Sequence, residues 1–140
     1  MKFLTWVFLL LAVAGLGSPV LPADKPVLSS PKLVAFYFHT SQRCVTCVAI
    51  ENYTKEALNS KFGDALRKGI VEWRVVNVEQ PQNRHFIRDF RLVSPSVVVV
   101  RLENGKSVKW QTLDKTWTLV RNKAQFIQYV QSSIDKFLEN

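Results

Sequence analysis

Two cysteines carry the most reactive side chains of this chain, and only two residues separate them. Cys44 and Cys47 lie in the stretch FHTSQRCVTCVAIE (38–51), which also contains His39 and Arg43. A pair at this spacing could be a redox dithiol, half of a metal site or a structural disulfide. A disulfide that closes so short a loop restricts the unfolded chain least, and disulfide-stabilised domains usually have four or more cysteines spread along the chain. The spacing therefore favours chemistry over a stabilising role.

Metal and haem sites are the main alternatives for this cysteine pair. A zinc site needs about four ligands, and besides carboxylates the chain offers only His39 and His85. A c-type haem needs a histidine directly after the second cysteine, where this chain has Val48. We predict no metal and no cofactor other than a redox-active disulfide. A metal-handling or redox-sensing domain that uses the same pair remains the alternative.

The elements around the pair decide its reactivity. An apolar run of strand length (33–38) is followed by a polar loop and then by a helical pattern from Cys44 or Val45 to about residue 68. Cys44 at the helix start meets unpaired backbone N–H groups and the positive end of the helix dipole, and Arg43 adds a positive charge. All three favour a thiolate. We predict that Cys44 is the attacking thiolate and Cys47, one turn further, the resolving thiol.

The rest of the chain predicts an α/β fold with the element order β-α-β-α-β-β-α. A strand–helix–strand start implies parallel pairing through a right-handed crossover, and an Asn104-Gly105 turn predicts an antiparallel hairpin. Residues 113–120 are ambiguous, whereas Asn122 is expected to cap the last helix. The further predicted elements are a strand at 70–78, a short helix at 81–90, strands at 97–102 and 107–112, and a helix at 122–138. Together they predict a mixed four-stranded sheet with helices on both faces.

A proline directly before the third strand adds to this pattern. Pro95 in LVSPSVVVV stands where a residue without a backbone N–H is tolerated in a sheet. With the 33–38 strand, the CVTC helix start, the VVVV–ENG–SVKW hairpin and the final helix, the chain from 33 to 138 resembles the thioredoxin-like superfamily. The resemblance implies a cis Ser94–Pro95 bond in a loop that packs against the dithiol. It also implies that Ser94 and its backbone contact the substrate next to the Cys44 sulfur.

The chain departs from ordinary thioredoxin at several positions near the dithiol. Val45-Thr46 stands between the cysteines instead of Gly-Pro, and Arg43 replaces a tryptophan. Ala35 stands where thioredoxin has a buried acid, so another group would have to handle the proton of Cys47. His39 and Glu51 are the candidates, with a loop histidine and a solvated helix glutamate as the simpler interpretations. Arg43 and the helix start predict a comparatively oxidising dithiol.

A second resemblance concerns a small exported family. The YFH…RC-x-TC-x-IE start and the histidine-containing NRHFIRDF segment are similar to ArsF-type subunits of nitrophenyl-compound nitroreductases. This resemblance implies a link to the reduction of nitroaromatic or arsenic compounds. We carry over only the dithiol fold and a role as the electron-passing subunit of a larger reductase, because no flavin, metal or nitroarene site is visible in the sequence.

The N-terminus has the pattern of a secretory signal peptide. Lys2 precedes an apolar run from about 3 to 16, and small residues follow it. We expect a signal peptide at 1–23 with cleavage after Ala23, or else after Ala14, then a flexible leader at 24–32 and one domain at 33–140. An uncleaved membrane anchor is the alternative. Both interpretations place the domain outside the cytoplasm, in the periplasm or as a secreted protein of the bacterial envelope.

Composition narrows the partners. The 140 residues carry a formal charge of +8, but the basic residues are scattered and form no run typical of nucleic-acid binding. We therefore expect no nucleic-acid partner. The expected partner is a protein disulfide or dithiol, or a membrane redox protein, with peripheral membrane association through the N-terminus as an additional expectation. The remaining alternative is a binding platform with a vestigial dithiol.

Overall fold

A four-stranded mixed sheet forms the centre of the molecule. The computed structural model describes residues 31–139, so the predicted signal peptide and most of the predicted leader lie outside the described residues. The strand order is β2-β1-β3-β4, with β1 parallel to β2 and antiparallel to β3, and β3 antiparallel to β4. The strands are β1 (Leu33–His39), β2 (Val71–Asn77), β3 (Ser96–Glu103) and β4 (Lys106–Thr112).

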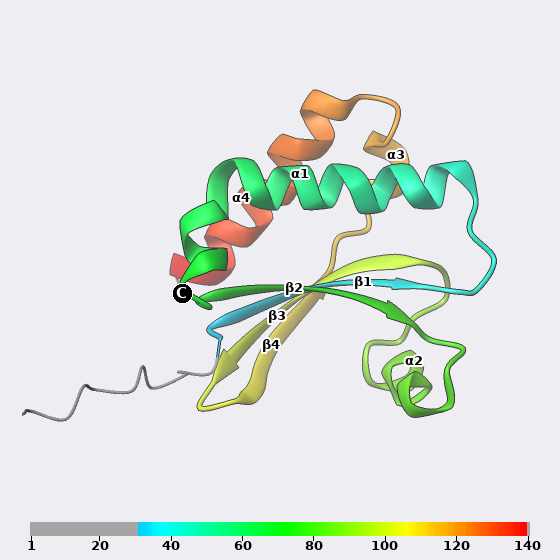
Figure 1. Ribbon diagram of the computed structural model, residues 1–140, viewed down its shortest axis with the longest axis horizontal. Helices are drawn as coiled ribbons and strands as arrows, with labels where there is room; N and C mark the ends of the chain where they lie inside the picture. The colour runs from blue at the N-terminus through cyan, green and yellow to red at the C-terminus, as the bar shows by residue number, and fades with distance from the viewer. Residues whose placement is uncertain (1–30, 140) are drawn as a thin grey trace, which may run out of the picture.

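Helices cover both faces of this sheet. In Figure 1, α1, α3 and α4 lie above the sheet and α2 lies below it. The helices are α1 (Val45–Arg67), the 3-10 helix η1 (Pro81–Asn83), α2 (His85–Asp89), α3 (Thr116–Leu119) and α4 (Lys123–Glu139). The predicted α/β architecture and the predicted element order are confirmed, with α3 as a short addition.

The central strand β1 is apolar on both faces because each face has its own core. Leu33, Ala35 and Tyr37 pack among buried side chains of α1 and α4, whereas Phe36 and Phe38 pack toward α2 and are buried on the other face. Consecutive residues of a strand point to opposite faces, so a strand covered on both sides reads as a continuous apolar run. This double burial fixes β1 and, with it, the loop that leads to the cysteines.

The long helix α1 ends where the sequence predicted. Gly69 has φ +67°, and the backbone N–H groups of Gly69 and Ile70 donate to the carbonyl groups of Leu66 and Ala65 at 3.1 and 2.9 Å. This is the Schellman arrangement, which favours glycine because a side chain at positive φ is strained. Within the helix, Phe62 has non-helical angles, so α1 is kinked at this residue.

The structure confirms some of the other local sequence predictions and adds an element that the sequence left open. Asn104 and Gly105 both have positive φ, as a tight hairpin turn requires, and Asn122 accepts a hydrogen bond from the Gln125 N–H at 3.2 Å as the expected cap. The ambiguous segment forms α3, which is only four residues long. Such a short helix shows no periodicity that a sequence could reveal.

The expected cis bond before Pro95 is wrong. No peptide bond among residues 31–139 is cis, so Ser94–Pro95 is trans. A trans X-Pro bond is preferred by about 0.5–1 kcal/mol. Here the trans loop is held by two hydrogen bonds, from the Ser96 hydroxyl to the Ser94 carbonyl at 2.8 Å and from Trp117 Nε1 to the Pro95 carbonyl at 2.9 Å. Pro95 has no backbone N–H in either isomer, so either isomer is tolerated directly before the strand.

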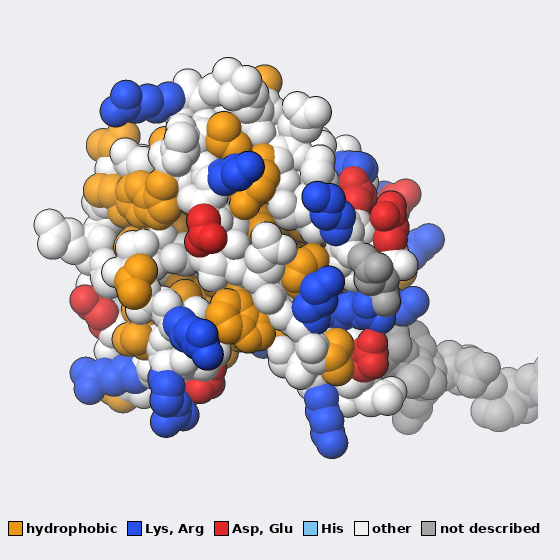
Figure 2. Space-filling model, turned by 180° about the vertical axis from the view of Figure 1, so that it is seen from behind, with side chains coloured by type: hydrophobic (Ala, Val, Ile, Leu, Met, Phe, Trp, Pro, Cys, Tyr) orange, Lys and Arg blue, Asp and Glu red, His pale blue; other side chains and the backbone are white. Residues whose placement is uncertain are grey.

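Charged side chains are distributed over the surface. Figure 2 shows Lys and Arg side chains spread across one face, several of them beside Asp or Glu side chains. Many form ion pairs, such as Lys123 with Glu56 at 2.7 Å and Arg101 with Glu103 at 2.8 Å. Among the residues that the structure describes, no helix combines the length and apolar character that crossing a membrane demands.

Candidate redox site

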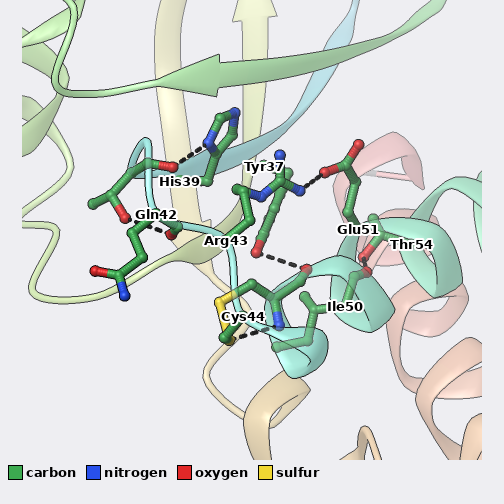
Figure 3. Close-up of polar contacts among 10 residues, drawn as sticks. Tyr37, His39, Gln42, Arg43, Cys44, Ile50, Glu51 and Thr54 are labelled. Atoms are coloured by element: carbon green, nitrogen blue, oxygen red, sulfur yellow. Dashed lines mark hydrogen bonds and ion pairs between the residues drawn. A yellow bond between two sulfur atoms is a disulfide. The ribbon is translucent and has the colours of Figure 1, made fainter.

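A disulfide joins Cys44 and Cys47 at the start of α1 (Figure 3). Cys44 is the N-cap residue, with extended angles of φ −89° and ψ 161°, and the backbone N–H of Cys47 donates to Cys44 Sγ at 3.0 Å. The Cα atoms of the two cysteines are 5.0 Å apart. The sulfur of Cys44 therefore occupies the place of a capping oxygen, where unpaired N–H groups and the helix dipole stabilise negative charge.

The two sulfurs differ in their access to a partner. Cys44 is exposed, whereas only 5% of the surface of Cys47 is accessible. Val45, directly after Cys44, is 89% exposed. Another protein's sulfur could approach Cys44 far more easily than Cys47. This asymmetry suits the roles predicted for the two residues, an accessible attacking thiol and a shielded resolving thiol.

Tyr37 of β1 contacts the turn from Cys44 to Cys47, which we call the cysteine turn. The sequence analysis did not identify this residue. Its side chain is fully buried in β1, and its hydroxyl donates to the Cys47 carbonyl at 2.9 Å. Burial raises the pKa of Tyr37 to about 12, so the phenol stays neutral and remains a donor at ordinary pH. The available signal was a single hydroxyl within the otherwise apolar run LVAFYF, two residues before the loop.

Arg43 and Glu51 form an ion pair beside this turn. The guanidinium carbon of Arg43 also lies 5.7 Å from the centroid of the Tyr37 ring, at a distance where a cation is attracted by an aromatic face. Both side chains are partly exposed, at 30% for Arg43 and 24% for Glu51. The sequence predicted each residue near the dithiol, but it did not predict that they pair with each other.

His39 lies at the end of β1 and is turned to its own loop. Its Nδ1 donates to the Thr40 carbonyl at 2.8 Å, and its ring centroid lies 6.0 Å from that of Tyr37. Within residues 31–139, neither the His39 nor the Glu51 side chain makes a hydrogen bond to either cysteine. Their role in proton transfer at Cys47 stays a prediction, for which the structure supplies no direct contact.

The loop before the dithiol is fixed by a carboxylate from the neighbouring strand's end. The backbone N–H of Ser41 donates to Glu79 Oε2 at 2.8 Å, and Asn77 Nδ2 donates to the Ser41 hydroxyl at 3.0 Å. Hydrogen bonds from Ser41 lower the pKa of Glu79. These contacts hold the loop against the end of β2.

Ser94 and Pro95 lie beside the end of β1 because Ser96 pairs with Phe38 in the sheet. A cavity of about 260 Å³ is lined by this loop, the end of β1 and α2, and its lining is mainly apolar. The lining residues that matter here are Phe38, His39, Ile87, Val93 and Pro95. Val93 is 97% exposed, so the loop presents an apolar side chain to solvent. Substrate contact at Ser94 stays a prediction.

The second histidine lies on a different element. His85 begins α2, and its Nδ1 donates to the Gln82 carbonyl at 2.9 Å. In the described part of the chain, no three His, Cys, Asp or Glu side chains gather closely enough to hold a metal ion. Within residues 31–139, neither His39 nor His85 therefore completes such a group with the two cysteines.

Comparisons with known proteins give structural neighbours only. No family model matches the chain, and no curated protein matches it. Solved structures that resemble it include a thioredoxin from Trypanosoma brucei brucei, with 17% identity, a TM-score of 0.43, and coverage of 78% of this chain and 80% of that one. A thioredoxin from Fasciola hepatica has 19% identity, a TM-score of 0.41 and coverage of 72% and 84%.

A third neighbour is a thioredoxin from Thermus thermophilus, with 18% identity, a TM-score of 0.45 and coverage of 76% of each chain. The thioredoxin-like architecture of this protein is visible in its own element order and strand order. That architecture carries a CxxC disulfide at the start of the first helix.

Proposed function

We propose that this protein is a thiol–disulfide oxidoreductase of thioredoxin-like architecture. One observation carries the proposal: an exposed cysteine caps a helix and is disulfide-bonded to a buried cysteine one turn later. This arrangement gives one accessible sulfur whose thiolate is stabilised and a second sulfur within bonding reach. Both are what stepwise exchange requires.

The exchange proceeds in two balanced steps. In the reduced protein, the Cys44 thiolate attacks one sulfur of a substrate disulfide, so that a mixed disulfide forms and the other substrate sulfur leaves as a thiolate. Cys47 then loses its proton and attacks Cys44 Sγ, and the second substrate sulfur leaves. Two electrons have passed to the substrate, and the Cys44–Cys47 disulfide has formed. Oxidation of a substrate dithiol is the same sequence reversed.

The substrate class follows from the exposure of Cys44. A protein disulfide or dithiol on an accessible segment could reach this sulfur. Val45, directly after Cys44, and Val93, in the Pro95 loop, are exposed apolar side chains. The proposal includes a periplasmic or secreted location, which is supported by the apolar N-terminal pattern of the sequence. It also includes a membrane redox partner and an electron-passing role in a larger reductase, which rest on the sequence resemblance alone.

Insulin reduction in the presence of dithiothreitol tests the proposal. The wild-type protein should accelerate the precipitation of reduced insulin, and Cys44→Ser should abolish the acceleration. Cys47→Ser is the matched variant, since it retains the attacking sulfur but cannot resolve the mixed disulfide itself. Only dithiothreitol then releases the adduct, so the acceleration should be much smaller than that of the wild type. Equal circular dichroism spectra would establish that the variants fold.

Two results would contradict the proposal. One is a folded wild-type protein with no activity in either direction of exchange. The other is an activity that Cys44→Ser retains. Stoichiometric zinc binding by the reduced protein without any exchange would instead support the metal-handling alternative.

A further inference from the structure

Three side chains from three segments meet beside the cysteine turn. Tyr37 comes from β1, Arg43 from the loop and Glu51 from the second turn of α1. Arg43 pairs with Glu51, lies over the Tyr37 ring, and is the residue directly before Cys44. Figure 3 shows its side chain extending toward Glu51 and away from the Cys44 sulfur. We call Tyr37, Arg43 and Glu51 the clamp.

The clamp changes the effect that Arg43 would otherwise have on the acidity of Cys44. A cation within about 4–6 Å of a thiol favours the thiolate, so a freely moving Arg43 next to Cys44 would make that thiol more acidic. In the structure the guanidinium is engaged by a carboxylate and an aromatic face. Its charge is therefore largely neutralised, and the helix start with the Cys47 N–H is left as the main source of thiolate stabilisation.

Other ionisable groups around the turn do not substitute for this pair. His39 donates Nδ1 to the Thr40 carbonyl, and Glu79 accepts from Ser41. Along the chain, ionisable groups on β1, on α1 and at the ends of the neighbouring elements include Tyr37 and His39 of β1, Arg43 of the loop, Cys47 and Glu51 of α1, Glu79 after β2, and Asp114 and Lys115 before α3. Within this set, Arg43 and Glu51 are the two that form an ion pair with each other.

We propose that Glu51 is a positioning residue that limits the acidity of Cys44 by holding Arg43 in the clamp. Release of Arg43 lets the guanidinium reach the Cys44 thiolate, raises the thiolate fraction below the titration midpoint and makes the disulfide more oxidising. A substrate that presents its own charge to Glu51 or Arg43 alters the acidity of Cys44 by the same route. This inference deepens the proposed function. It rests on that function only in linking the acidity of Cys44 to thiol–disulfide exchange.

The test measures the pH dependence of alkylation of Cys44 in the reduced full-length chain. Iodoacetamide is the probe, and peptide mass mapping assigns the label to Cys44 or Cys47. Glu51→Gln should raise the thiolate fraction of Cys44 at a pH well below its midpoint by about tenfold, the lower limit of the effect of a nearby opposite charge. Glu56→Gln is the matched control, because Glu56 is on the same helix and pairs with Lys123 instead.

A second background separates a positioning role from a direct charge effect. In Arg43→Gln protein, Glu51→Gln removes a carboxylate but releases no cation, so its effect should be clearly smaller than in the wild-type background. An equal effect in both backgrounds would overturn the proposal, as would no rise in the thiolate fraction in Glu51→Gln. A merely structural role of Glu51 would lower the melting temperature without moving the midpoint.

The readout does not depend on catalysis. The alkylation profile needs no substrate disulfide, so a protein that fails to reduce insulin can still show or lack the Glu51 effect. Failure of the proposed function and failure of this inference are therefore distinguishable. The reduction potential, measured by equilibration with glutathione, should shift to a more oxidising value in Glu51→Gln and stay unchanged in Glu56→Gln.

Discussion

At the scale of single residues, a buried phenol contacts the turn that carries the two cysteines. Tyr37 joins β1 to the first turn of α1 through its hydrogen bond to the Cys47 carbonyl. Because the hydroxyl is fully buried, its neutral form is strongly favoured, and its pKa is raised to about 12 from the ordinary value of 10.0. A titratable group of this kind ties the stability of the fold to pH.

Tyr37→Phe should lower stability at neutral pH by about 0.5–1.5 kcal/mol, the usual net contribution of a hydrogen bond. The raised pKa adds a pH-dependent difference. The folded protein holds the phenolic proton more tightly than the unfolded chain, so this contribution is complete below about pH 10 and is lost as the pH rises through about 12. Across that interval the wild-type protein should lose up to about 2–3 kcal/mol that the phenylalanine variant keeps.

Urea denaturation at neutral pH and at about pH 11, within the interval between the two pKa values, measures this difference. The stability gap between wild type and Tyr37→Phe should narrow or reverse at the higher pH. Tyr129 also has a raised pKa, but it is present in both proteins and cancels in the comparison. A gap that widens with pH would contradict this account of Tyr37.

The sequence predicted some residues of the site and missed others. The roles proposed for Cys44 and Cys47 were predicted from a two-residue spacing at a helix start, which is a local pattern. Tyr37 was missed because a hydroxyl in an apolar run shows its importance only when its partner is known. Arg43 and Glu51 were each named, but their pairing depends on the direction in which the long arginine side chain turns, and no spacing rule fixes that direction.

At the scale of elements, α1 carries the site, and its two ends are built differently. Its start is capped by the sulfur of Cys44, and its end by Gly69 in the left-handed region. A side chain added at Gly69 would meet no atom within 4 Å, so only the backbone angle opposes it. Gly63, in contrast, lies inside the helix, where a Cβ would make ordinary contact with Arg67 at 3.5 Å.

Alanine substitutions at these two glycines should have opposite effects. Gly69→Ala should destabilise the protein by about 1–2 kcal/mol, the cost of a left-handed angle for a residue with a side chain. Gly63→Ala should stabilise it by up to about 1 kcal/mol, because alanine favours the helix interior. Thermal unfolding of both variants checks the pair. A stabilised Gly69→Ala would show that the helix does not end as described.

Most elements were predictable because their signals are local. The apolar run of β1, the Asn104-Gly105 turn and the amphipathic pattern of α4 each specify one structure without help from distant residues. The isomer of the Ser94–Pro95 bond was predicted wrongly, since it was carried over from a resemblance. The contact that holds this loop comes from Trp117, 22 residues later in a helix too short for pattern analysis.

At the scale of the whole molecule, residue 32 and the dithiol lie at opposite ends of β1. The backbone N–H of Lys32 donates to the Ile70 carbonyl at 2.9 Å, and that of Leu102 donates to the Lys32 carbonyl at 2.8 Å. These bonds place residue 32 at the N-terminal end of β1. Cys44 follows the opposite end of the seven-residue strand, about 20 Å away at the usual rise per residue. The dithiol therefore faces away from the side on which the N-terminal segment joins the domain.

Two of the three strand pairings follow from the connections between neighbouring elements. The crossover through α1 makes β1 and β2 parallel neighbours, and the tight hairpin makes β3 and β4 antiparallel neighbours. The sequence specified both pairs. The pairing of β1 with β3 joins them into one sheet. No local signal in the sequence predicts this pairing.

Trapping of the mixed disulfide tests most directly whether Cys44 is the attacking thiolate of this molecule. Reduced Cys47→Ser protein is incubated with a peptide disulfide, and the covalent adduct is located by mass spectrometry. The account predicts an adduct of one peptide on Cys44 that persists until reductant is added, and no comparable adduct in Cys44→Ser protein, where only the buried Cys47 remains. An adduct that forms as fast on Cys47, or no adduct on Cys44 in folded protein, would contradict it.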